Sequence, residues 1–145
     1  MSKSTLESFF GTDEKKSKTG VRIPMGYNAN DEEVAFWIAE INNPKHTAAQ
    51  RANSRLLESS RRNTKRHDAV LAKVVAMGIL LKWEGVLDKE KKEVKDTIDN
   101  KTKYLTKYPK LFQAVMEQSM NQDNYMPEED DGDADQSPQE DTEKN

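Results

Sequence analysis

Residues 65–83, KRHDAVLAKVVAMGILLKW, contain the longest uninterrupted apolar run of this 145-residue chain. Their apolar side chains would cover nearly all sides of a helix: one stripe holds Leu71, Val74, Val75, Gly78 and Leu81, and Val70, Met77 and Leu80 lie beside it. A helix at the surface shows a polar face, whereas a helix that is apolar all round is buried. The sequence therefore predicts a central helix over residues 65–83, around which the domain packs.

Shorter elements are expected before the central helix. Val21–Met25 is compatible with a strand, which ends in the turn-rich residues 26–30. A helix is predicted from about Asn30 or Asp31, because apolar residues follow at helical spacing and Pro44 comes after them. These apolar residues are Val34, Trp37, Ile38 and Ile41. A second helix is predicted over residues 45–62.

The chain after the central helix is expected to form a loop and two more helices. Residues 86–95 enclose charged side chains between apolar ends, which predicts an exposed loop or small hairpin. Thr97 can cap a helix that turns Ile98, Leu105 and Tyr108 toward the core. Pro109 suits the first position of a last helix, because proline lacks the amide hydrogen that would be unpaired there.

The predicted fold class is mainly α: a small domain of about five helices, with at most a short β-hairpin or strand pair. Residues 1–20 are expected to be a flexible lead, residues 21–126 the helical domain, and residues 127–145 a disordered acidic tail. The tail has no apolar periodicity. It therefore cannot offset the entropy of ordering, which is on the order of 1 to 2 kcal/mol per residue.

The net charge of −3 conceals a strong asymmetry. Residues 121–145 carry ten acidic side chains against Lys144, a net charge of −9, so residues 1–120 carry +6. Residues 45–67 hold seven lysines and arginines against Glu58 alone, a net charge of +6. The positive charge of the domain is therefore concentrated in one segment.

Four arginines of that segment would share one face of a continuous helix: Arg51, Arg55, Arg62 and Arg66. Such a face can be solvated, bind nucleic acid, or dock on an acidic protein surface. Single-strand binding favours aromatic side chains among the cations, and residues 45–67 contain none. We therefore favour docking of a partner protein on this face, with nucleic acid as the alternative.

A second candidate docking segment lies at the N-terminus. Leu6, Phe9 and Phe10 have the spacing of the sliding-clamp-binding box, although Lys3 stands where that box has its glutamine. The alternative is a short amphipathic segment that folds back on the domain or docks on another partner. The sequence thus offers Leu6, Phe9 and Phe10 as a docking segment for a clamp or for another protein.

Enzymatic, metal-binding and membrane-spanning functions find no support in the residues. The chain has no cysteine and two histidines, His46 and His67, and it contains no phosphate-binding glycine loop. The apolar run Val74–Leu81 is far shorter than the roughly 20 residues that cross a bilayer. We expect a non-enzymatic protein without cofactor or metal that does not enter a membrane.

The order of short motifs along residues 6–125 resembles the tail assembly chaperones of long-tailed bacteriophages. The motifs are Leu6 to Phe10, Gly20-Val-Arg-Ile-Pro24, Phe36-Trp-Ile-Ala39, Asn42-Asn-Pro44, Ile79-Leu-Leu-Lys-Trp-Glu-Gly-Val86 and Tyr108-Pro109. Lys89-Glu-Lys-Lys92 departs from the family, which has a glycine turn there. Within this pattern we expect structural roles for Trp37, for Trp83, which would close the core, and for Gly85, which would reverse the chain.

The resemblance implies a non-catalytic factor that binds the tape measure protein and recruits tail tube subunits before leaving the finished particle. It implies residence in the cytoplasm of the host cell and absence from the mature virion. Self-association is a further expectation. The alternative function is a small phage protein that binds nucleic acid or a sliding clamp, through the four arginines or through Leu6, Phe9 and Phe10.

Overall fold

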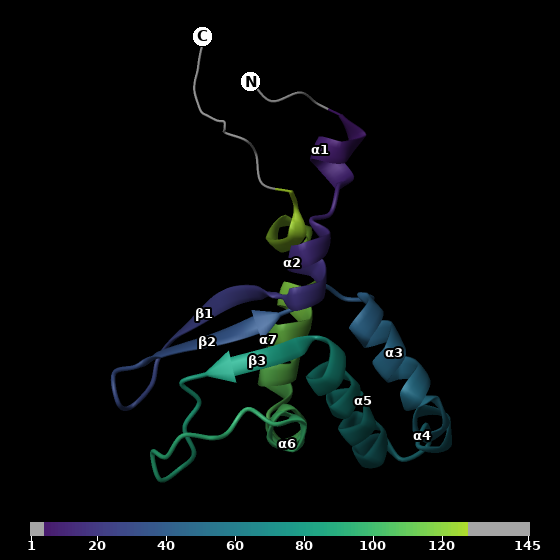
Figure 1. Cartoon of the computed structure of the whole chain (residues 1–145). Helices are drawn as coiled ribbons and strands as arrows, with labels where there is room; N and C mark the ends of the chain where they lie inside the picture. Colours follow the sequence, from purple (N-terminus) through teal and green to yellow (C-terminus); the bar gives the residue numbers. More distant parts are fainter. Residues whose placement is uncertain (1–4, 128–145) are drawn as a thin grey trace.

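The computed structural model describes residues 5–127. Its helices are α1 (Leu6–Phe10), α2 (Glu14–Thr19), α3 (Pro44–Ala52), α4 (Ser54–Ser59), α5 (Thr64–Gly78), α6 (Ile98–Lys107), α7 (Pro109–Met120) and the 3₁₀ helix η1 (Gln122–Tyr125). Its strands are β1 (Val21–Tyr27), β2 (Glu33–Ile38) and β3 (Leu80–Glu84). The described part of the chain is shown in Figure 1.

The expected mainly α fold is wrong, because an antiparallel sheet organises the described residues. Its strands are ordered β1-β2-β3, so the middle strand β2 pairs with a neighbour on each side. The fold class is therefore mixed α/β. The expected strand over Val21–Met25 is confirmed as β1, but its partner β2 lies where a helix was expected.

Residues 33–38 form β2 where we expected a helix over about 31–41. The spacing of Val34, Trp37 and Ile38 suits a helix, yet Val34, Phe36 and Ile38 also alternate with period two, as on one face of a strand. Phe36 and Ile38 are buried in the core, and Trp37 lies on the opposite face. Pairing with both β1 and β3 satisfies the backbone groups of β2, and this long-range pairing decides between the two periods.

The central helix is also shorter than expected. α5 ends at Gly78, and Leu80–Glu84 turns back as β3 beside β2. The apolar run therefore belongs to two elements that are both buried, which explains why it appears apolar on every side. Periodicity cannot distinguish a buried helix from a buried strand within one short apolar run.

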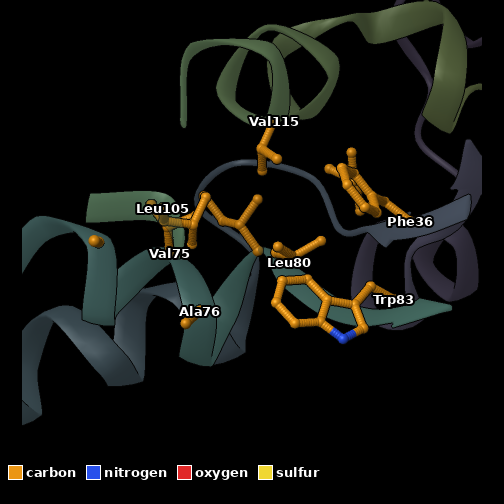
Figure 2. Close-up of a cluster of buried hydrophobic side chains, with 10 residues drawn as sticks. Phe36, Val75, Ala76, Leu80, Trp83, Leu105 and Val115 are labelled. Atoms are coloured by element: carbon orange, nitrogen blue, oxygen red, sulfur yellow. The ribbon is translucent and has the colours of Figure 1, made fainter. Parts of the chain in front are cut away.

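The core lies where the helices α5, α6 and α7 pack against one face of the sheet. Figure 2 shows Val75 and Ala76 of α5, Leu105 of α6 and Val115 of α7 around Leu80, with Phe36 and Trp83 beside it. These side chains come from β2, α5, β3, α6 and α7, which are spread along the chain from residue 36 to residue 115. The core therefore depends on long-range contacts rather than on one helix.

The remaining elements follow the sequence more closely. Thr97 caps α6, and Pro109 opens α7, as predicted. The expected helix over residues 45–62 is interrupted at Asn53, which separates α3 from α4. The loop after β3 folds as a small hairpin, with one bridge between Leu87 and Glu93.

The N-terminal stretch up to Gly20 contains α1 and α2. α2 is joined to the body, because the amide of Glu40 donates to Ser17 O at 3.0 Å and that of Asp13 donates to Tyr125 O at 2.7 Å. Beyond Pro127, the expected acidic tail lies outside the described residues. Between residues 5 and 127, no helix is both long and apolar enough to cross a membrane.

Candidate functional site

The four arginines predicted as a docking face lie on three helices and a turn rather than on one helix. Arg51 is in the last turn of α3, Arg55 in α4, Arg62 in the turn that follows, and Arg66 in the first turn of α5. We call these four residues the basic surface. All four side chains are exposed, and no ion pair within residues 5–127 involves any of them.

Polar side chains at the helix ends fix the helices that carry the basic surface, and two of them, Asn53 and Ser60, are buried. Asn53 Nδ2 donates to Ala49 O at 2.8 Å where α3 meets α4, and Ser60 Oγ lies 3.0 Å from His67 Nδ1. Asn63 Oδ1 accepts from the amide of Arg66 at 3.1 Å and caps α5. The two corners are therefore held by specific hydrogen bonds, and the arginines project from a fixed scaffold.

The N-terminal docking segment forms α1. Thr5 and Ser8 make a capping box, which stabilises this single helical turn. Its apolar side chains face solvent: Leu6 is 78% exposed, Phe9 55% and Phe10 69%. Gln122 Nε2 donates to Phe9 O at 2.7 Å, so a backbone contact holds α1 while its apolar side chains stay uncovered.

A groove between α6 and the hairpin after β3 is a third candidate, which was not expected from the sequence. Its volume is about 730 Å³. We call it the aromatic groove, because Trp83, Tyr104 and Tyr108 form a ladder along it. The ring centroids of Trp83 and Tyr104 are 5.9 Å apart, and those of Tyr104 and Tyr108 are 6.0 Å apart.

The rim of the aromatic groove carries lysines that lack an acidic partner. Lys103 Nζ lies 5.8 Å from the centroid of Tyr104, and Lys107 Nζ lies 5.5 Å from that of Tyr108. The described residues make no ion pair with either lysine. The nearby Asp88 accepts from backbone amides of its own loop at 2.8 and 3.0 Å, so its carboxylate is engaged there.

Both walls of the groove are anchored to the sheet. Lys101 of α6 is buried, and its Nζ lies 3.1 Å from Asp96 Oδ1 and 3.1 Å from Leu81 O. Trp83 Nε1 donates to Val94 O at 3.2 Å, which fixes the base of the hairpin. The groove is therefore a preformed feature of the fold.

A repeat in the sequence could have indicated the groove. Lys103-Tyr104 and Lys107-Tyr108 repeat the same dipeptide at a spacing of four, which places both tyrosines on one side of a helix. We had expected Tyr108 to face the core together with Ile98. This is wrong, because each is 45% exposed, and Leu105 alone of the three is buried.

The three residues expected to be structural occupy different settings. Trp83 is buried in the core cluster. Trp37 is half-buried on the opposite face of the sheet, where Lys82 Nζ lies 4.4 Å and Arg22 Cζ 5.6 Å from its ring centroid. Gly85 follows β3 with φ +79°, and a Cβ there would lie 2.4 Å from Glu33 O.

The two histidines have structural hydrogen bonds. His46 is buried, and its Nδ1 accepts from the amide of Asn42 at 2.9 Å. Burial lowers the pKa of His46 below its ordinary value, because the charged form loses its hydration. Within the described chain, no group of three or more histidine and acidic side chains is arranged to hold a metal ion.

One comparison with known proteins identifies a family. Residues 36–136 match the family model of the YdaY prophage protein. The matched region includes the basic surface and the aromatic groove, and it begins after α1. No curated protein and no solved structure matches the chain. Because the match spans more than half of its length, the chain belongs to the YdaY prophage protein family.

Proposed function

We propose that this prophage protein is a non-catalytic tail assembly chaperone, which binds the tape measure protein and recruits tail tube subunits during tail assembly. Two findings support the proposal. The order of motifs along residues 6–125 resembles that of tail assembly chaperones, and the family model identifies the chain as a prophage protein. Its place of action would be the cytoplasm of the host cell, before the virion is complete.

The observation that carries the proposal is the basic surface. Arg51, Arg55, Arg62 and Arg66 are exposed and lack acidic partners in the described chain, so an acidic partner can pair with them without displacing existing ion pairs. Leu56 lies on the same short helix as Arg55 and is 40% exposed. Exposed cations and an exposed apolar side chain within one short helix suit reversible docking of an amphipathic helix, which the long helical tape measure protein would offer.

Co-expression with the tape measure protein of the same prophage tests this proposal. We expect a soluble complex with the wild-type chain and loss of co-purification with the Arg55→Glu/Arg62→Glu variant. The matched control is Lys73→Glu/Lys110→Glu, which makes the same charge change at exposed positions outside the basic surface. The proposal fails if the wild-type chain leaves the tape measure protein insoluble, or if both double variants bind as well as the wild type.

Nucleic acid is the second candidate partner, because phosphates also pair with exposed arginines. The same two variants distinguish the candidates in a gel-shift experiment at low salt. Retardation of DNA or RNA by the wild-type chain, lost in Arg55→Glu/Arg62→Glu and kept in the control, would favour nucleic acid. If neither the full chain nor a chain that ends at Pro127 retards DNA or RNA, nucleic acid is excluded as the partner.

A further inference from the structure

We infer that α1 of one chain binds in the aromatic groove of a second copy, so that copies associate head to tail. The inference uses two surfaces that the proposed docking of tape measure protein does not use. One surface is the apolar side of α1, which the described residues leave exposed, and the other is the aromatic groove, whose rim carries Lys103 and Lys107 on the side of α6. Glu7 of α1 can pair with Lys103 or Lys107 of the groove, neither of which has a carboxylate partner among the described residues.

The inserting element is α1. Leu6, Phe9 and Phe10 are spaced i, i+3 and i+4, so they project from one side of the helical turn. Glu7 lies about 60° around the helix from Phe10 and therefore borders this apolar side. α1 thus presents three apolar anchors with a carboxylate at their edge, which is the usual form of a helix that docks in a groove.

The receiving element is the aromatic groove. Tyr104 and Tyr108 offer ring surfaces on which aromatic side chains pack well, and Tyr104 in turn packs on the buried Trp83. Lys103 and Lys107 form the rim on the side of α6, and neither has a carboxylate partner in the described structure. A bound α1 would supply that carboxylate through Glu7, so the charges of the two elements are complementary.

The contact must form between two chains. α1 lies at one end of the molecule, and α6 and the hairpin lie at the opposite end, as Figure 1 shows. Only Gly11 and Thr12 separate α1 from Asp13, whose amide is bound to Tyr125 O. Two extended residues span about 7 Å, so α1 cannot reach the groove of its own chain.

The inserting and receiving surfaces are different, and the association is therefore heterologous. The copy at one end of an assembly still has a free groove, and the copy at the other end has a free α1. Further copies can therefore add to form an open chain, or the two ends can bind each other and close a ring. Larger assemblies should accordingly form as the protein concentration rises.

Sedimentation velocity of the full chain over a range of concentrations tests this inference. We expect the average mass of the wild-type chain to rise with concentration. The α1 variant Phe9→Ala/Phe10→Ala and the groove variant Lys103→Glu/Lys107→Glu should each weaken the association at least tenfold. Met25→Ala is the control, because Met25 is also exposed and apolar but lies on β1, outside α1 and outside the lining of the groove. Circular dichroism checks that each variant keeps the wild-type fold.

A mixture of the two variants gives the decisive result. The α1 variant keeps an intact groove and the groove variant keeps an intact α1, so the mixture should form a one-to-one dimer and nothing larger. The single substitution Glu7→Lys should also prevent assembly. Assembly should return when Glu7→Lys and Lys103→Glu/Lys107→Glu are placed in the same chain, because the charges of both surfaces are then reversed. A wild-type chain that stays monomeric, variants that assemble normally, or a mixture that stays monomeric would each overturn the inference.

Discussion

Replacing Gly78 by alanine tests how the domain positions the helix that leads to the basic surface. A Cβ at Gly78 would lie 2.4 Å from His46 Cα, 2.7 Å from His46 N and 3.0 Å from Lys45 C. All three are backbone atoms in the first turn of α3, so no side-chain rotation relieves the overlap. Either α3 moves away from the end of α5, or α5 ends earlier.

Asn43 makes both movements costly. Its Oδ1 caps α3 by accepting from the amides of Lys45 and His46, and its Nδ2 donates to Gly78 O at 2.8 Å. Overpacking costs about 1 to 3 kcal/mol, and the loss of a cap or a buried hydrogen bond about 1 kcal/mol each. Helix propensity returns at most about 1 kcal/mol. Gly78→Ala should therefore lower the free energy of unfolding by roughly 2 to 4 kcal/mol.

Thermal and urea unfolding measure this loss, which should lower the melting temperature by roughly 10 °C. Hydrogen exchange should show early loss of protection at the amides of Lys45 and His46. Gly26→Ala is the control, because it adds a Cβ at a positive φ where no atom lies within 4 Å, and it should leave α3 protected. A Gly78→Ala variant as stable as the wild type would refute the reasoning, since helix propensity alone predicts a gain.

Three further substitutions test the anchors of the core. Lys101→Met should lower the unfolding free energy by about 2 kcal/mol, as measured in urea, because it leaves Leu81 O and the partly exposed Asp96 without their partner. Tyr125→Phe should cost about 1 to 2 kcal/mol in the same assay, because Tyr125 Oη donates to Ile38 O at 2.9 Å; an unchanged midpoint would contradict that role. For His46, the pKa is lowered in the folded state, so the unfolded chain binds a proton more readily below its own pKa of about 6.5. The free energy of unfolding should therefore fall as the pH drops below about 6.5, by at most about 1.4 kcal/mol per pH unit for this group. In His46→Gln, the free energy of unfolding should depend less steeply on pH in this range.

Local signals in the sequence predicted some elements correctly. Thr97 and Pro109 start α6 and α7 because a cap and an N-terminal proline act within one helical turn. The sheet was missed because Val34, Phe36, Trp37 and Ile38 fit two periods, and only pairing with distant strands chooses between them. The groove was missed for a related reason, since its walls come from segments about 20 residues apart.

The sequence by itself determined the charge asymmetry, the presence of a buried apolar run and the spacing of Leu6, Phe9 and Phe10, because these depend on composition and on neighbouring residues. The tertiary structure alone decided that the run divides at Gly78 into a helix and a strand. It also decided that the arginines project from three helices and a turn, and that Trp83, Tyr104 and Tyr108 line one groove. These features depend on which backbone groups and side chains meet across long stretches of chain, and local propensity carries no information about such contacts.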